Sequence, residues 1–247
     1  MGPAPVRIFK LLEVLAKSDS PVRLADLATA LKVPKSNVHR LAQILVDEGY
    51  CSQEAGTGRY EATLKTFELG TLIGNRHPLK RAAGPFAQEL QQATSETVAV
   101  AVLDGSDIIY LDRLIPLLPI RATLQAGLRI PAAFTAAGRA LLASHPDRDA
   151  IIDRIVANDT HDRPLELAAL NAEMSIIQAR GYATSCSGWL PGVNSVAAVI
   201  GTGEGRIPIG SLALIGPAER MSDEFMQASA TLVMNACLKI SEVMGRP

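Results

Sequence analysis

Apolar residues recur with helical spacing in three short stretches at the start of the chain. The apolar positions are Val6, Phe9, Leu11, Leu12 and Leu15, then Leu24, Leu27, Ala28 and Leu31, then Val38, Leu41, Ala42 and Leu45. This spacing predicts three helices that each turn one side toward a shared core. Lys32 and Val33 form the short connection before the third helix, Pro34 suits its first position, and Gly49 suits its end. The pattern predicts a three-helix unit with a helix-turn-helix, in which the first helix covers the other two.

Opposite the apolar side of the third predicted helix, basic and hydrogen-bonding side chains gather in its N-terminal half. They are Lys35, Ser36, Asn37, His39, Arg40 and Gln43. A helix inserted in the major groove of DNA exposes these turns. We predict that Lys35 contacts a phosphate and that the other five reach base edges. Helix-turn-helix spacing also occurs in small helical domains where such a face is only solvated.

Two short β-prone runs follow Gly49 and favour DNA binding over a merely solvated surface. The runs cover residues 50–52 and 59–61, and the loop between them holds Gly56 and Gly58, which can supply positive φ. We predict a hairpin wing with Arg59 at its tip and with Thr57 and Arg59 as wing or phosphate contacts.

The rest of the chain alternates between helical and strand patterns. Leu64, Phe67, Leu69 and Leu72 line a predicted linker helix, which could pair with its copy in another subunit and which the stretch from Gly74 to Pro78 should interrupt. Further on, the pattern predicts helices over 85–93, 165–180 and 222–244, and strands over 97–103, 107–111, 193–200 and 207–214. Paired strands with helices between them predict an α+β domain.

Charge separates the two parts of the chain. Residues 1–80 hold 11 Lys and Arg against 8 Asp and Glu, a net charge of +3, whereas residues 81–247 hold 13 against 17, a net charge of −4. A charge of +3 is small for a monomer on DNA, so we expect the basic module to act in several copies, as a homo-oligomer. With 247 residues, 48% of them hydrophobic, the chain can form one or two domains with a sizeable core.

The chemistry-bearing residues predict no enzyme. Cys51, Cys186 and Cys237 match no metal spacing, the four histidines show no paired ligand spacing, and no Gly-x-Ser-x-Gly elbow exists. The glycines between 201 and 205 fit a hairpin turn better than a phosphate loop. We expect no metal, no cofactor and no membrane contact, and, because the N-terminus lacks signal-peptide features, a cytoplasmic protein.

The segment from Gly127 to Ala140 combines a loop with a helix of small residues. Backbone N–H groups at such a helix N-terminus can hold a carboxylate. Alternatively, the small residues Ala136, Ala137 and Gly138 serve only close packing of the helix on a sheet.

The chain resembles the IclR family of bacterial transcriptional regulators. The resemblance rests on Leu27-Ala28, residues 34–36 and 38–41, residues 56–60, Leu69-Gly70, residues 127–140, residues 181–183 and Gly216-Pro217, and thus spans nearly the whole chain. It implies a winged helix-turn-helix (1–63), a linker helix (64–80) and a GAF-like effector-binding domain (81–247), in dimers that pair into tetramers on an operator. It also implies a small organic acid as effector, bound beside the turn from Phe134 to Gly138.

Departures from the family pattern change the expected effector. Ser195 stands where a pocket cysteine is frequent, and Ala213 and Ile215 stand where the closing strand often offers two serines. Fewer polar groups, with Phe134 and Trp189 nearby, favour an aromatic or otherwise hydrophobic acid, although Trp189 could equally be a core or lid residue. The expected effector-binding residues are Leu128, Ile130, Phe134, Thr135, Ala136, Ala137, Ser185, Trp189, Ser195 and Ala213.

Two alternatives remain from the sequence. One is an enzyme that acts on a small acid, but Ser195 and Asp112 have no evident partner histidine. The other is a DNA-binding protein that works without an effector, because apolar side chains have closed its cavity.

Overall fold

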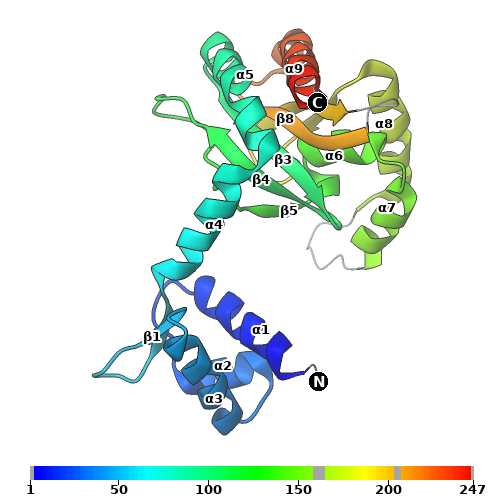
Figure 1. The fold of residues 1–247 in the computed structure, drawn as a ribbon. Helices are drawn as coiled ribbons and strands as arrows, with labels where there is room; N and C mark the ends of the chain where they lie inside the picture. Colours follow the sequence, from blue (N-terminus) through cyan, green and yellow to red (C-terminus); the bar gives the residue numbers. More distant parts are fainter. Residues whose placement is uncertain (1–2, 158–164, 203–206, 246–247) are drawn as a thin grey trace. The chain divides into compact units, whose positions relative to one another are not determined.

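A computed structural model describes residues 3–157, 165–202 and 207–245. Contacts divide the chain into two compact units, residues 1–75 and residues 76–247, and each is described by itself (Figure 1). Within the described residues, no helix has the length and apolar character needed to cross a bilayer.

The first unit contains the three predicted helices. They are α1 (Ala4–Ala16), α2 (Leu24–Leu31) and α3 (Lys35–Asp47). Val38, Leu41, Ala42 and Leu45 are all buried, as the helical spacing predicted, and they join Leu27 in one hydrophobic core. The opposite, polar side of α3 therefore faces away from this core.

The prediction for α1 was wrong at two positions. Leu11 and Leu15 are buried one turn apart, but Phe9 and Val6 are 66% and 41% exposed. Phe9 is two residues before Leu11, which places it about 200° around the helix. The core of this small unit covers only one side of α1, so a residue on another side of the helix remains exposed.

The ends of α2 and α3 depend on particular backbone conformations. Lys32 ends α2 in the left-handed region with φ +53°, and Gly49 follows α3 with φ +73°. Pro34 has an extended conformation and caps α3, so the helix begins at Lys35, one residue later than predicted. The proline ring still fits because the cap position needs no helical N–H bond.

The predicted wing is present and shifted by one residue. Strands β1 (Cys51–Gln53) and β2 (Tyr60–Ala62) pair antiparallel. Gly58 has the expected positive φ of +66°, but Gly56 does not. Arg59 is not at the tip, because its carbonyl accepts a hydrogen bond from the Glu54 N–H and continues the hairpin toward β2.

Helix α4 (Leu64–Arg76) leaves its apolar residues uncovered. It continues through Gly74 and ends before His77, within the stretch from Gly74 to Pro78 that was predicted to interrupt it, and α5 (Pro78–Thr94) follows. The prediction that a helix starts at Pro85 was wrong, since Pro85 lies inside α5. Pro85 is exposed there, so water can satisfy the carbonyl that it leaves without a donor.

The second unit is built on a six-stranded antiparallel sheet with the order β5-β4-β3-β8-β7-β6. Its strands are β3 (Thr97–Asp104), β4 (Asp107–Leu114), β5 (Arg129–Pro131), β6 (Ala183–Cys186), β7 (Val193–Thr202) and β8 (Ile207–Pro217). The predicted hairpin of β7 and β8 is confirmed, although residues 203–205 of its glycine-rich turn lie outside the described residues.

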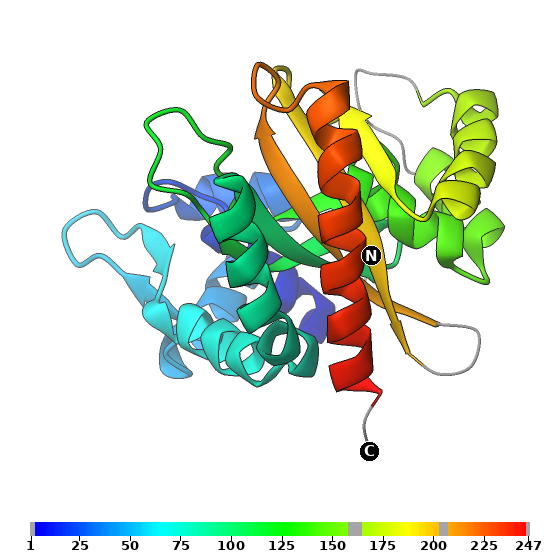
Figure 2. The ribbon, with the colours of Figure 1, turned by 90° about the horizontal axis from the view of Figure 1, so that it is seen from above.

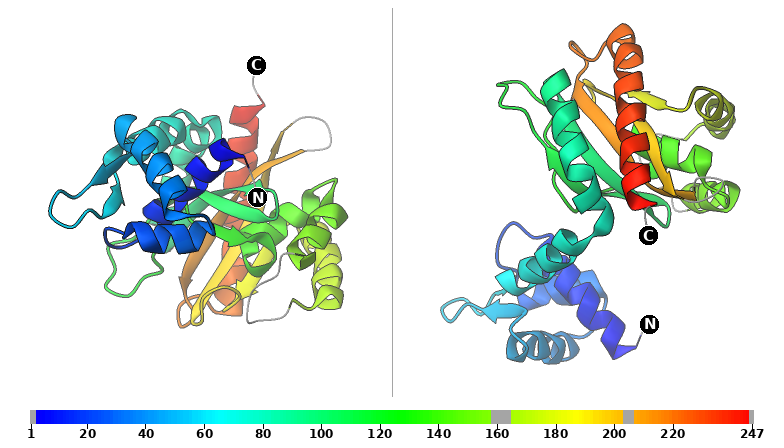
Figure 3. Two further views of the ribbon diagram at one scale, coloured as in Figure 1. Left: turned by 90° about the horizontal axis from the view of Figure 1, so that it is seen from below. Right: turned by 45° about the horizontal axis from the view of Figure 1, so that its top comes forward.

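Helices cover both faces of this sheet. Helix α5 and the predicted closing helix α9 (Asp223–Met244) lie side by side on one face (Figures 2 and 3). Helices α6 (Ala136–Ser144), α7 (Arg148–Ala157) and α8 (Leu167–Arg180) belong to the opposite core. Helix α6 packs mainly on β7 and β8. The α+β class of the prediction is confirmed.

Candidate functional site

The outward side of α3 presents the predicted DNA-contacting residues together. Lys35, Ser36, His39, Arg40 and Gln43 are exposed, and Asn37 is half-buried. The Gln43 side chain donates a hydrogen bond to Asp47 over 2.9 Å. The Arg40 guanidinium forms no ion pair or hydrogen bond with any residue that the structure describes. Arg40 is therefore available to an external acceptor.

The wing offers a smaller set of groups. Thr57 is exposed in the loop, where its hydroxyl bonds to the Glu54 carboxylate. The Arg59 guanidinium lies 3.5 Å from the Pro21 carbonyl and is half-buried, so it braces the base of the wing. Of the two residues, Thr57 is the more exposed.

The second unit contains a narrow cavity between the sheet and the segment before α6. The cavity has a volume of about 30 Å³. The unfilled space is about 360 Å³ when the open space at its mouth is included. Its lining residues are Tyr110, Leu124, Ile130, Phe134, Thr135, Ser185, Gly188, Trp189, Leu190, Val193, Ser195 and Ile215. Trp189 and Leu190, at 37% and 43% exposed, are the exposed apolar residues of this lining.

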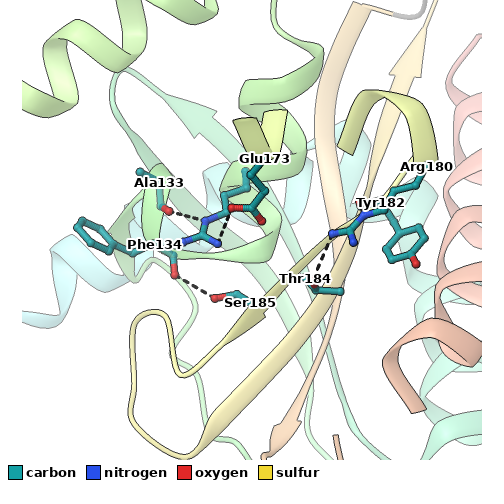
Figure 4. Close-up of polar contacts among 8 residues, drawn as sticks. Ala133, Phe134, Glu173, Arg180, Tyr182, Thr184 and Ser185 are labelled. Atoms are coloured by element: carbon teal, nitrogen blue, oxygen red, sulfur yellow. Dashed lines mark hydrogen bonds and ion pairs between the residues drawn. The ribbon is translucent and has the colours of Figure 1, made fainter. Parts of the chain in front are cut away.

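One wall of the cavity is a tight turn held by polar contacts. The 3-10 turn from Ala132 to Phe134 runs into α6, whose cap Thr135 accepts a hydrogen bond from the Gly138 N–H over 3.0 Å. The Ser185 hydroxyl lies 3.4 Å from the Phe134 carbonyl and donates to it (Figure 4). The phenyl ring of Phe134 lies 6.4 Å from the Trp189 ring, centroid to centroid. The turn is thus fixed from the β6 side.

Arg139 ties the same turn to α8. Its Nε donates to the Ala133 carbonyl over 2.7 Å, and its Nη1 pairs with the Glu173 carboxylate at 2.9 Å. Arg139 lies in an adjoining cleft and does not line the cavity. Its charge is paired with that of Glu173, and none of the residues that line the cavity is basic.

The structure brings six of the ten expected effector-binding residues into the cavity. These are Ile130, Phe134, Thr135, Ser185, Trp189 and Ser195. Leu128 is half-buried, and Ala136, Ala137 and Ala213 are buried; none of the four is among the lining residues. Ala136 and Ala137 form the first turn of α6, so their backbone N–H groups, rather than their side chains, are the groups of interest.

Six lining residues were not among the expected effector-binding residues. They are Tyr110, Leu124, Gly188, Leu190, Val193 and Ile215. Tyr110 could have been found, because it alternates with Ile108 on a predicted strand. Leu124 lies in an irregular segment between β4 and β5, where no periodicity marks the inward side.

The cavity offers neutral hydroxyl groups and apolar surface. The hydroxyls belong to Tyr110, Thr135, Ser185 and Ser195, and none of the lining residues is charged. Burial raises the pKa of Tyr110 above its ordinary value, so its hydroxyl stays protonated at neutral pH. Among the described residues, no three His, Cys, Asp or Glu side chains converge to hold a metal ion. The arrangement suits binding of an apolar ligand.

The two units define a class of protein: a helix-turn-helix DNA-binding module followed by a separate α+β domain. Residues 4–55 match the IclR helix-turn-helix domain, and residues 72–242 match the domain described as bacterial transcriptional regulator IclR C-terminal. The chain belongs to the IclR family of bacterial transcriptional regulators.

Individual relatives agree with this assignment. The chain is 30% identical over 229 residues to a protein named probable transcriptional regulator SauR from Cupriavidus necator, with 90% of each chain covered. An IclR family regulator from Brucella abortus has the same fold, with a TM-score of 0.83, 24% identity, and 98% and 92% of the two chains covered. An IclR homologue from Microbacterium hydrocarbonoxydans, solved with 4-hydroxybenzoate, matches with a TM-score of 0.76 and 19% identity over 97% and 98% of the chains.

Proposed function

We propose that this regulator binds an operator through α3 and its wing, and that a small organic acid in the cavity changes its affinity for DNA. The exposed polar side of α3 carries the first half of this proposal. Ser36, Asn37, His39, Arg40 and Gln43 contact base edges, and Lys35, Thr57 and Arg59 contact phosphates. Residues 1–63 form the DNA-binding domain, 64–80 the linker and 81–247 the effector domain.

The cavity carries the second half of the proposal. Its walls are apolar or neutral, and the N–H groups of Ala136 and Ala137 begin α6 without a partner inside the helix. Those two groups and the helix dipole can hold a carboxylate, while Phe134 and Trp189 enclose an aromatic ring. The relative solved with 4-hydroxybenzoate supports an aromatic acid as the effector.

An aromatic acid should change the fluorescence of Trp189 when it binds. The chain has one tryptophan, and it lines the cavity, so an aromatic ring that enters the cavity changes the surroundings of the indole. We expect saturable titration curves with benzoate-type acids and weaker binding of glyoxylate or pyruvate. Free N-acetyltryptophanamide, titrated in parallel, corrects for absorption by the acids. Tighter binding of pyruvate than of every aromatic acid would contradict this effector class.

Regulation itself is tested by measuring DNA binding with and without the acid. A DNA site selected from a random library with the full chain serves as operator. Effector coupling of typical size, about 1–3 kcal/mol, corresponds to a change in affinity of about 5-fold to 150-fold. If the acid binds and operator affinity stays constant, the protein is a DNA-binding protein that works without an effector.

We further propose that α4 joins copies of the chain. Leu64, Phe67 and Ile73 are 80%, 72% and 71% exposed, and none of the residues of α4 is buried. A helix of 13 residues with this much apolar surface in water is unusual for a monomer and typical of an association surface. A homo-oligomer also brings several copies of the weakly basic module to one duplex.

Replacing Phe67 and Ile73 together with glutamate should reduce the assembly to a smaller species. Two charges would have to be buried without partners if the α4 helices paired, at a cost of several kcal/mol. The mass in solution, measured by light scattering after gel filtration, reports the change. Ile176→Glu on α8, where Ile176 is 55% exposed, is the matched control and should keep the assembly. An unchanged mass for the α4 variant contradicts this interface.

A further inference from the structure

Tyr110 is the most deeply buried polar group in the lining of the cavity. It lies on β4 opposite Ala101 of β3, on the sheet face that α6 covers, and is 3% exposed. Its backbone is fixed on the outer side, where Gly127 donates to its carbonyl over 2.8 Å and its N–H donates to the Leu128 carbonyl over 3.1 Å. The side chain position is therefore set by the sheet.

The Tyr110 hydroxyl differs from the other two buried hydroxyls of the cavity. Thr135 accepts a hydrogen bond from the Gly138 N–H, and Ser185 donates to the Phe134 carbonyl. No hydrogen bond joins the Tyr110 hydroxyl to any residue that the structure describes, and this hydroxyl is not among the fully buried polar atoms, so it is accessible from the cavity that Tyr110 lines. A ligand that displaces water from this hydroxyl has to supply a hydrogen bond in its place, because leaving the group without one costs free energy.

The protonation state of the Tyr110 hydroxyl restricts which groups can form a hydrogen bond with it. Burial raises the pKa of Tyr110, and no basic side chain lines the cavity to stabilise a phenolate. Tyr110 therefore offers a neutral O–H that can donate one hydrogen bond and accept another. Its partner must reach the cavity and carry an oxygen or nitrogen of its own.

The place of Tyr110 in the cavity shows where on a ligand that partner lies. Tyr110 belongs to β4, whereas Thr135, the cap of α6, belongs to the segment that leads into the helix, and both line the same cavity. A carboxylate held at the first turn of α6 therefore leaves the ring of the ligand to reach Tyr110.

We propose that Tyr110 is a specificity-determining residue, which hydrogen-bonds to a hydroxyl on the aromatic ring at a position remote from the carboxylate. The inference rests on the proposed effector function of the same cavity. It narrows the effector from aromatic acids in general to hydroxylated ones.

The test compares ligands and variants in one set of titrations. Affinities of benzoate, 3-hydroxybenzoate and 4-hydroxybenzoate are measured by calorimetry for the full chain and for Tyr110→Phe. The wild type should prefer the better hydroxybenzoate over benzoate by about tenfold, the usual size for one buried hydrogen bond. Tyr110→Phe should lose that preference while it still binds benzoate.

Two controls separate loss of the hydrogen bond from loss of the fold. Tyr182→Phe makes the same chemical change on a half-buried tyrosine that packs against the opposite core, beside Arg180 (Figure 4), and should keep the preference. Thermal unfolding shows whether Tyr110→Phe is folded. Independently of any variant, 4-fluorobenzoate should bind the wild type like benzoate, because fluorine is a poor hydrogen-bond partner.

The outcomes distinguish this inference from the function on which it rests. If Tyr110→Phe retains the preference for a hydroxybenzoate, or if the wild type shows none, Tyr110 is not the specificity residue, although aromatic acids remain effectors. If no aromatic acid binds the wild type, the proposed effector class fails, and this inference fails with it.

Discussion

Replacing Gly138 with alanine should destabilise the effector domain by about 2–3 kcal/mol, because overpacking a close contact costs about this much. A Cβ at this position would lie 2.1 Å from the carbonyl oxygen of Ala132 and 2.4 Å from its Cα. These are backbone atoms of the 3-10 turn, so no flexible side chain can move aside. The alanine would gain about 1 kcal/mol of helix propensity, which is too little to compensate.

The same substitution at Gly84 provides a matched control. Gly84 lies inside α5 of the same unit and is exposed, and a Cβ at this position would meet no atom within 4 Å. Gly84→Ala should therefore stabilise the unit by about 0.5–1 kcal/mol. Urea unfolding followed by Trp189 fluorescence reports on this unit alone, which matters because two units can unfold separately. Equal stability of the two variants would contradict the close contact at Gly138.

Loss of the Gly138 contact should also weaken effector binding. Ala132 begins the turn that positions Phe134 and Thr135, both of which line the cavity. If alanine pushes the turn outward, the first turn of α6 moves away from the place where we expect the carboxylate. A variant that is destabilised but binds the acid as well as the wild type would separate the turn from the binding site.

The elements that could be predicted from the sequence are those with a strong periodic pattern. Val38, Leu41 and Leu45 repeat at helical spacing and are buried, and the hairpin of β7 and β8 follows from two long β-prone runs. Strands β5 and β6, of three and four residues, are too short to show a period. Helix α7 was missed because its apolar residues are interrupted by charged ones.

The errors at Phe9 and Pro85 have a common physical origin. The apolar character of a residue does not show which side of a helix packs against the core. In α1 the side that carries Leu11 and Leu15 is buried, and Phe9 lies on another side and is exposed. Proline is read as a helix start, but an exposed position inside α5 tolerates it. Both depend on which surface is buried, which is a tertiary property.

The candidate cavity was predictable only where a motif marked it. The segment that contains Ile130, Phe134 and Thr135 was identified from its small residues and its resemblance to the family. Tyr110 and Leu124 enter the cavity because strand pairing and a loop bring them there from distant parts of the sequence. Such convergence depends on sheet order, which periodicity does not encode.

Arg40→Ala should weaken binding to the operator by about 5-fold to 150-fold, which corresponds to about 1–3 kcal/mol for one base contact. Arg40 is exposed on the polar side of α3, and its guanidinium is unpaired among the described residues. It can therefore form a bidentate contact with a guanine without breaking a contact inside the protein. Removing it should leave the fold intact, because the buried side of α3 does not change.

The pattern of the loss distinguishes the two roles that Arg40 can have. As a base contact, Arg40→Ala relaxes the preference at one base pair, so operators altered at that position bind the variant as well as the original does. If Arg40 contacts a phosphate, Arg40→Ala weakens binding to all DNA sequences alike. It then also reduces the slope of log affinity against log salt concentration by about one. Fluorescence anisotropy with single-base operator variants at two salt concentrations separates these results. Lys17→Ala, which removes an exposed cation after α1, is the control for charge alone and should change affinity little.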